Sequence, residues 1–228
     1  SPDGKKVAFI GQDDPLTSPQ NDHVGVLDIA TKKREWVSRA LDRTFATTSG
    51  SIAPIWMPDG SLLAFAEDRG TAHVAKIDPS GKNAPQWLTG GRRIVKMVHA
   101  ANGVIGFVAS AVNQMTEAYA LVGGNERKLS NLGANLVAAT APQTWEHFTV
   151  PCGSNYSGGP AEIDAWIMKP KDFDAKKKYP VLLNVHGGPH TQYGETYFDE
   201  AQMQAAAGFV VLRSEEHTSE LQSQSTIS

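Results

Sequence analysis

The chain has 228 residues, of which 40% are hydrophobic and 20% charged; this is typical of soluble globular domains and excludes intrinsic disorder and collagen-like repeats. The net charge of −3, with no basic run longer than Lys176-Lys177-Lys178, gives no electrostatic footprint for nucleic acid or an anionic membrane, so neither is an expected partner. No apolar run reaches the roughly 18 residues that span a bilayer, and the single cysteine, Cys152, cannot form an internal disulfide.

Three related segments recur along the first 132 residues. Each opens on a turn-forming tetrapeptide and continues as an apolar run: Ser1-Pro2-Asp3-Gly4 before Val7-Ala8-Phe9, Met57-Pro58-Asp59-Gly60 before Leu63-Ala64-Phe65, and Ala100-Ala101-Asn102-Gly103 before Ile105-Gly106-Phe107. Proline presets the first dihedral of a turn, Asp or Asn bonds back to the backbone, and glycine supplies a positive φ. The pattern predicts hairpin turns followed by strands.

A second pair of short strands is predicted downstream in each segment. The pairs are 26–29 with 32–37, 74–78 with 86–88, and 119–122 with 126–129. Four strands in each period of about 40 to 50 residues are typical of β-propeller blades, and the longer first period indicates an insertion around Asp13 to Asp22. Since propellers close with roughly four to eight blades, we expect further blades upstream of Ser1, where the chain opens without a Met. The compartment and the oligomeric state are not fixed by the sequence.

The pattern changes after Pro142. Residues 146–150 and 161–168 are predicted strands, joined by a Gly-, Ser- and Asn-rich loop from Gly153 to Pro160. Residues 181–185 and 208–212 are nearly continuous apolar runs, which predict strands covered on both faces. Between them the Ala-rich segment 199–207 predicts a helix that ends at Gly208, so the order is a βαβ unit with parallel strands.

The run His186-Gly187-Gly188-Pro189-His190 follows directly on the predicted strand 181–185. Ligands of open α/β sheets bind at that end of the strands. Two consecutive glycines allow a sharp turn with uncovered N–H groups, which is what an oxyanion hole requires. The alternative from the residues alone is a glycine-rich turn that has no catalytic role or that binds phosphate at a helix N-terminus.

The stretch from Ala165-Trp166-Ile167-Met168-Lys169-Pro170 through Tyr179-Pro180-Val181-Leu182-Leu183-Asn184-Val185 to His186-Gly187-Gly188-Pro189-His190 resembles the entry to the hydrolase domain of the prolyl oligopeptidase family. The likeness is greatest to its acylaminoacyl-peptidase and dipeptidyl-peptidase branches. It implies the C-terminal blades of a β-propeller over residues 1–143, followed by the N-terminal part of an α/β-hydrolase domain over residues 144–212.

By the same resemblance, the parent protein is expected to be a serine peptidase that hydrolyses short peptides through an acyl-enzyme, without a cofactor or a metal. The backbone N–H of Gly188 is then the candidate oxyanion donor, with Gly187 and His186 supporting the turn. Two alternatives stay open: an esterase on the same fold, since HGG motifs also serve carboxylic esters, and a propeller-based binding or scaffold protein without catalysis.

The catalytic triad is expected outside this chain. The family's nucleophile motif, Gly-x-Ser-x-Gly, does not occur in the sequence, and the triad Asp and His follow the nucleophile. The chain by itself is therefore expected to be inactive and poorly stable. No general base is assigned to the histidines, which we predict to be surface or packed side chains (His23, His73, His99, His147 and His190). Asp13-Asp14 and Asp22-His23 are predicted to lie in an inter-strand loop rather than in a metal site.

The last segment, residues 213–228, is expected to be non-native. From Arg213 the sequence Arg-Ser-Glu-Glu-His-Thr-Ser-Glu-Leu-Gln-Ser matches one reading frame of a sequencing-library adapter. The alternative is a polar, partly helical tail in which Ser214 caps a helix. Residues encoded by an adapter carry no information about the native fold, so the predicted hydrolase segment ends at Leu212.

Overall fold

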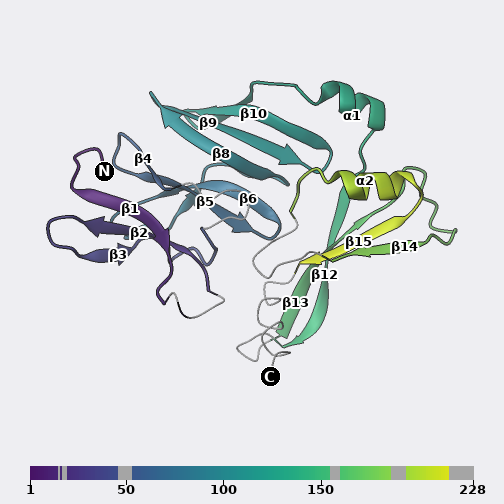
Figure 1. Ribbon diagram of the computed structural model, residues 1–228, viewed down its shortest axis with the longest axis horizontal. Coiled ribbons are helices and arrows are strands. Elements are labelled where there is room, and N and C mark those ends of the chain that lie inside the picture. Colours follow the sequence, from purple (N-terminus) through teal and green to yellow (C-terminus); the bar gives the residue numbers. More distant parts are fainter. Residues whose placement is uncertain (15, 17–19, 46–52, 155–159, 186–193, 216–228) are drawn as a thin grey trace. The chain divides into compact units, whose positions relative to one another are not determined.

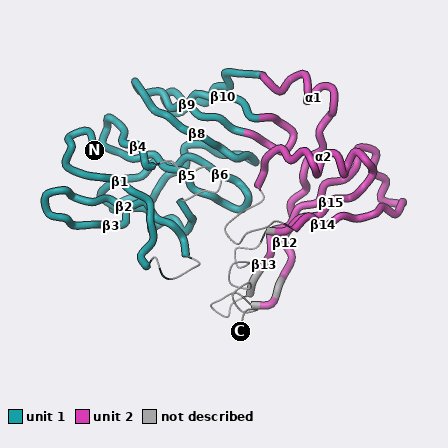
Figure 2. The backbone as a smooth tube through the Cα atoms, viewed as in Figure 1, with its two compact units in different colours: residues 1–109, 116–131 teal, residues 110–115, 132–228 magenta. Residues whose placement is uncertain are grey.

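The computed structural model describes residues 1–14, 16, 20–45, 53–154, 160–185 and 194–215. The chain divides into two compact units, coloured separately in Figure 2: unit 1 comprises residues 1–109 and 116–131, and unit 2 comprises residues 110–115 and 132–228. Unit 2 thus includes residues 110–115, the turn between two strands whose other residues belong to unit 1.

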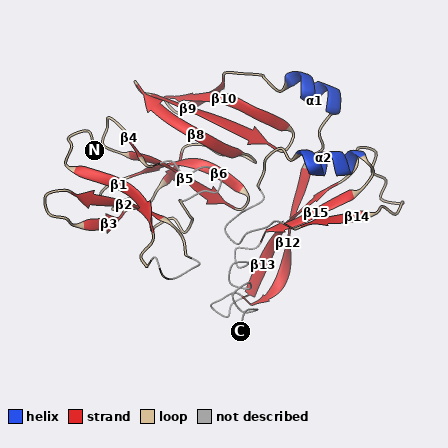
Figure 3. Cartoon of the chain, in the orientation of Figure 1, coloured by secondary structure: helices blue, strands red, loops and turns tan. Residues whose placement is uncertain are grey.

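Unit 1 contains a three-stranded sheet and an eight-stranded sheet (Figures 1 and 3). Most strands pair with their neighbours in the chain, but β8 pairs with β6 rather than with β7. A three-stranded antiparallel sheet contains β1 (Lys6–Gly11), β2 (His23–Asp28) and β3 (Arg34–Trp36). A second group contains β4 (Ile55–Trp56), β5 (Leu62–Asp68), β6 (Thr71–Ile77) and β7 (Gln86–Trp87). A third contains β8 (Ile94–Ala101), β9 (Val104–Ala111), β10 (Gln114–Val122) and β11 (Asn125–Lys128), and it joins the second where Ala72 pairs with Ile94.

The three predicted turns are confirmed. Gly4, Gly60 and Gly103 adopt φ values of 71°, 83° and 77°, a region that glycine enters without steric cost. A Cβ at any of the three would meet no atom within 4 Å, so the backbone conformation alone favours glycine there. In the second turn the Asp59 carboxylate accepts a hydrogen bond from the Ser61 backbone N–H at 2.9 Å. The predicted strands after each turn are β1, β5 and β9, and the predicted second pairs are β2–β3, β6–β7 and β10–β11.

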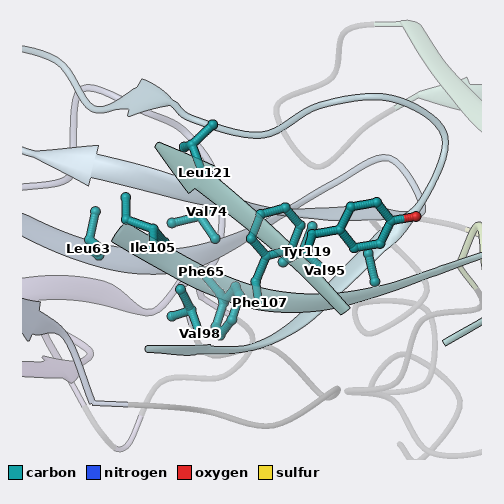
Figure 4. Packing of buried hydrophobic residues seen from close by; sticks show 10 residues of the cluster. Leu63, Phe65, Val74, Val95, Val98, Ile105, Phe107, Tyr119 and Leu121 are labelled. Atoms are coloured by element: carbon teal, nitrogen blue, oxygen red, sulfur yellow. The ribbon is translucent and has the colours of Figure 1, made fainter. Parts of the chain in front are cut away.

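The core of unit 1 lies on the faces of these sheets. One cluster is drawn in Figure 4 and contains Leu63, Phe65, Val74, Val95, Val98, Ile105, Phe107, Ala109, Tyr119 and Leu121. Within it the rings of Phe107 and Tyr119 stack at 5.3 Å, and the guanidinium of Arg93 lies over both rings while it binds Glu126. A second cluster is built around Val24, Phe45, Leu62, Ala64 and Ile77.

Unit 2 contains a mixed sheet with the strand order β12-β13-β15-β14, and two short helices. Its elements are α1 (Ala134–Thr140), β12 (Trp145–Ser154), β13 (Pro160–Met168), β14 (Val181–Asn184), α2 (Asp199–Ala206) and β15 (Val210–Glu215). Strands β14 and β15 are parallel and α2 lies between them in the chain, so the predicted βαβ unit is confirmed. Helix α1 was not predicted. Neither α1 nor α2, the helices of the described part of the chain, has the length or apolarity of a membrane span.

One face of this sheet packs against α2. Ala201 and Ala205 of the helix are fully buried with Trp145, Trp166, Met168 and Val211 of the strands. Val112, from the loop that belongs to unit 2, completes this cluster and is 5% exposed. Gly208, just after the helix, has a φ of 92°, as a helix-terminating glycine does.

The opposite face of β14 corrects one expectation. Val181, Leu183 and Val185 are 56%, 63% and 76% exposed, so the strand is not covered on both faces by the described residues. Side chains of a strand alternate between the two faces of a sheet, and it is the set facing away from α2 that is open.

Candidate functional site

The residues with a predicted chemical role, His186, Gly187 and Gly188, lie outside the described part of the chain, as does His190. The structure does describe the residues on both sides of this segment. On one side the chain reaches the end of β14 at Asn184, and on the other it is described again from Gly194. The candidate site is therefore defined by its two flanks.

The first flank is the carboxyl end of a strand that pairs in parallel with its neighbour. Asn184 is aligned with Arg213 of β15, and its side-chain amide donates a hydrogen bond to Gln204 Oε1 of α2 at 3.1 Å. Gln204 in turn donates to Glu200 Oε1 at 3.2 Å, one helical turn earlier. The end of β14 is thus held by the strand beside it and by the helix, at the edge of the sheet where α/β proteins bind ligands.

The second flank is a buried turn formed by Gly194, Glu195 and Thr196. The Thr196 N–H donates to the Gly194 carbonyl at 2.8 Å. The indole N–H of Trp166, on β13, donates to Glu195 Oε1 at 2.8 Å, and the Thr196 hydroxyl lies 2.6 Å from the hydroxyl of Ser110. Glu195 is 3% exposed and Trp166 is fully buried. Side chains from two separate parts of unit 2 therefore fix this turn.

Arg213 lies beside this turn. Its guanidinium stacks on the rings of Trp145 and Trp166, at 4.1 and 5.2 Å from their centroids, and donates to the Gly194 carbonyl at 2.8 Å. The side chain is 1% exposed. The expected boundary of the adapter-derived segment consequently falls inside β15, while residues 216–228 lie outside the described part of the chain.

A histidine–aspartate pair lies on the β12–β13 hairpin. His147 Nε2 is 2.6 Å from Asp164 Oδ1, and the imidazole lies 5.2 Å from the ring of Trp166. Asp164 is 7% exposed. Both residues face the same side of two adjacent strands, so the pair connects β12 to β13, as expected for a packed histidine.

The other described histidines are also packed or exposed side chains. His73, in β6, is 7% exposed and lies 3.3 Å from the Thr89 hydroxyl. Burial, with the nearby positive charge of Arg93, lowers the pKa of His73 from 6.5 to about 4. Burial likewise lowers the pKa of His23. Asp13 lies in the loop between β1 and β2. Its carboxylate accepts a hydrogen bond from the indole N–H of Trp36 and forms an ion pair with Arg39.

Sequence inspection missed Trp166, Glu195 and Ser110. No pattern marks them, because Glu195 stands in a polar stretch, Gly194-Glu195-Thr196, that is typical of an exposed turn. Its burial depends on a tryptophan 29 residues earlier in the chain. Trp166 was correctly predicted to lie in a strand. A buried indole N–H requires a hydrogen-bond acceptor, and that requirement was the available signal that a polar group lies beside Trp166.

Curated proteins match most of the chain. The peptidase YuxL of Bacillus subtilis, which is described as uncharacterized, is 29% identical over 164 residues, or 70% of this chain and 24% of its own length. A probable dipeptidyl-peptidase 5 of Emericella nidulans is 25% identical over 195 residues, or 83% of this chain and 26% of its own. No family model matches the chain.

A solved structure shares its fold. The Pyrococcus horikoshii acylaminoacyl peptidase superposes with a TM-score of 0.73 and 19% identity, over 93% of this chain and 31% of the peptidase. Peptidases thus match in sequence and in fold. The chain is therefore similar in sequence to peptidases and shares the fold of an acylaminoacyl peptidase.

The likeness of fold involves both units of the chain, since a match over 93% of the residues cannot be confined to one of them. The chain spans about a quarter of the length of the curated relatives it matches. The residues that the family resemblance assigned to the oxyanion hole lie between the two flanks described above.

Proposed function

We propose that the protein to which this chain belongs is a serine peptidase that hydrolyses short peptides through an acyl-enzyme. The observation that carries the proposal is the similarity to peptidases along most of the chain. In such a reaction a serine oxygen attacks the peptide carbonyl carbon, a general base takes the serine proton, and the carbonyl oxygen becomes an oxyanion. The base then protonates the leaving amine, and water releases the acyl group.

The part of this chain in that reaction is to stabilise the oxyanion. We assign the donor to the backbone N–H of Gly188, with Gly187 and His186 supporting the turn. Its support is the position of the segment, directly after the carboxyl end of a strand in a parallel pair, with both flanks fixed by side-chain hydrogen bonds. Loss of one oxyanion donor costs roughly 100- to 1,000-fold in kcat.

We further propose that the three groups of strands in residues 1–143 are consecutive blades of a β-propeller, and that residues 144–212 begin an α/β-hydrolase domain. The successive strand order and the repeated turns support the blades. The parallel β14–α2–β15 unit supports the hydrolase domain. The nucleophile, Asp and His of the triad are then supplied by residues outside these 228, and the chain alone is inactive.

The segment 213–228 is proposed to be adapter-derived. Sequencing the gene from genomic DNA across codon 213 tests this directly. A genomic sequence that departs from Arg213 onward supports the proposal, whereas the same codons in genomic DNA would refute it.

The catalytic proposal is tested on the full-length protein with peptide anilides, short acyl esters and a fluorophosphonate probe. We expect cleavage of the anilides and covalent labelling of one serine, with the 228-residue chain as the unlabelled control. Turnover of esters without anilides would replace the peptidase by an esterase. A full-length protein that ignores the probe and both substrates would instead indicate a non-catalytic binding protein.

A further inference from the structure

The chain passes between the two units at three points, because unit 2 contains residues 110–115 as well as the residues from 132 onward. Two segments of unit 2 therefore lead into unit 1. The turn segment, residues 110–115, joins β9 to β10, and the connecting segment, residues 132–144, contains α1 and leads to β12. A change in the orientation of one unit relative to the other has to be absorbed by the backbone in or beside these two segments.

One side chain of α2 binds both segments. The amide nitrogen of Gln202 donates to the Val112 carbonyl at 3.3 Å and to the Gln143 carbonyl at 2.8 Å. Its Oε1 accepts the backbone N–H of Gln143 at 2.8 Å. A glutamine amide has two N–H donors, and here one donor is used for each segment. The side chain of Gln202 thus joins two parts of the chain that lead into unit 1 separately.

The two segments differ in how else they are held within unit 2. Val112 of the turn segment is 5% exposed in the hydrophobic cluster, and the Ser110 hydroxyl lies 2.6 Å from that of Thr196. In the connecting segment, α1 buries none of its 7 residues. A helix this short is not stable on its own in water. The bonds to Gln143 therefore attach a weakly packed segment to a helix that is itself anchored in the cluster by Ala201 and Ala205.

We infer that Gln202 is a hinge clamp, which holds the turn segment and the connecting segment together on α2 so that they move as one. A hinge consists of a few backbone positions that absorb changes in φ and ψ. Two segments held by one side chain leave fewer such positions than two segments that move independently. The clamp consequently restricts changes in orientation between the units. The inference uses only contacts inside unit 2 and does not depend on the proposed peptidase function.

The test measures the distance between two spin labels in the full-length protein by double electron–electron resonance. The labels are attached at Lys82→Cys in unit 1 and Lys177→Cys in unit 2, both exposed positions, and the native cysteines are replaced by serine. Gln202→Leu removes the donors and the acceptor of the clamp with little change in volume. We expect the width of the distance distribution to increase about twofold or more, because the two segments then move independently.

Gln202→Glu is the second variant. At pH 8 its ionised carboxylate keeps an acceptor for the Gln143 N–H but has no donor for either carbonyl. The turn segment loses its bond to the clamp, so the distance distribution should broaden in this variant too. Because glutamate has nearly the shape of glutamine, Gln202→Glu decides the question if Gln202→Leu fails to fold.

Gln143→Ala is the matched control. The side chain of Gln143 donates to the Ala141 carbonyl at 2.9 Å, whereas Gln202 binds the backbone of Gln143. The substitution therefore removes an amide beside the clamp and leaves the bonds of the clamp in place. The width of the distance distribution should equal that of the wild type.

Amide exchange separates a loosened hinge from an unfolded unit. In Gln202→Leu the Gln143 N–H should exchange about 10-fold faster, since its acceptor is lost, while protection in β12 and β13 should stay within about threefold of the wild type. Loss of protection in these strands along with the broadening would overturn the inference, because unit 2 itself would then be unfolding. Unchanged widths in the folded Gln202 variants, or equal broadening in Gln143→Ala, would overturn it as well.

Discussion

The two units use polar side chains in different ways. In unit 1 the same contact recurs: Asp3, Asp59 and Asp78 each accept the backbone N–H of the residue two positions later, at 3.1, 2.9 and 2.9 Å. Unit 2 also has one such contact, from the Lys176 N–H to Asp174 at 3.0 Å. Its contacts of Trp166 with Glu195, Ser110 with Thr196 and Asn184 with Gln204 are each of a different kind, and all three flank one segment. A contact repeated at successive turns is explained by the fold, whereas dissimilar contacts that converge on one segment point to function.

The units also differ in how their strands are covered. The first five residues of β5 are all buried, because side chains from both faces of its sheet enter the cores of unit 1. In β14 the exposed and half-buried residues alternate, because α2 covers one face only. Stability in unit 2 is therefore concentrated in the one cluster that contains Trp145, Trp166 and Val112.

The largest loss of stability is expected when a charge is placed in the hydrophobic cluster of unit 2. Val112→Asp puts a carboxylate among buried aromatic and aliphatic side chains, and we expect a loss of about 4 kcal/mol or more. Amide protection in α2 and β15, measured by hydrogen exchange, should fall by about 1,000-fold. Protection in β5 and β6 should be largely kept.

The control for this change lies on the same hairpin. Val122 is 52% exposed, so Val122→Asp should lower protection less than tenfold in either unit. Equal losses in both units from Val112→Asp would contradict the separate cores described here.

A smaller loss of stability is expected in unit 1 when the pH is lowered. His73 is held neutral, because its burial and then the charge of Arg93 lower its pKa to about 4, while Asp68 and Glu126 oppose the shift weakly. The unfolded state takes up a proton near pH 6.5 and the folded state near pH 4. Stability from this group is therefore complete above about pH 7 and is lost as the pH falls from 6.5 to 4, by at most about 3 kcal/mol.

Comparison with the His73→Phe variant separates the contribution of His73 to the pH dependence of stability from the contribution of the carboxylates. The wild type should lose more amide protection in β6 between pH 7 and pH 5 than the variant does, after correction for intrinsic exchange rates. Identical pH dependence in the two proteins would show that His73 is not held neutral.

Much of the fold was predictable because local chemistry determines it. The glycines of the three repeated turns need positive φ, and the apolar runs after them need a sheet face, so turns and strands followed from short stretches of sequence. The helix before Gly208 and the parallel pair around it followed in the same way. Helix α1 was missed, since its sequence Ala-Asn-Leu-Val-Ala-Ala-Thr has no cap box and no buried face.

The flanks of the candidate site were not predictable for a different reason. The contacts of Glu195 and Thr196 come from Trp166 and Ser110, which lie 29 and 86 residues away in the chain. The sequence shows a glycine-rich run and what it can do, but which side chains hold its ends depends on tertiary packing. The exposure of β14 was mispredicted for the same reason. An apolar run predicts that a strand is buried, but the run does not show whether other residues of the chain pack against it.

The smallest predicted effect concerns a repeated turn. The pKa of Asp59 is lowered most by Lys76 and next by Ser61, yet the Lys76 and Asp59 side chains are 42% and 56% exposed. Solvent screens such a pair, so Lys76→Ala should cost no more than about 0.5 kcal/mol. Asp59→Ala also removes the acceptor of a backbone N–H in the turn and should cost about 1 kcal/mol.

Both values can be measured from the amide protection of β5, at low salt and in about 0.5 M NaCl. The effect of Lys76→Ala should vanish in salt, whereas that of Asp59→Ala should persist, because a hydrogen bond to the backbone N–H is less sensitive to screening than a surface ion pair. A larger cost for Lys76→Ala than for Asp59→Ala would mean that the ion pair, and not the repeated turn chemistry, stabilises this part of unit 1.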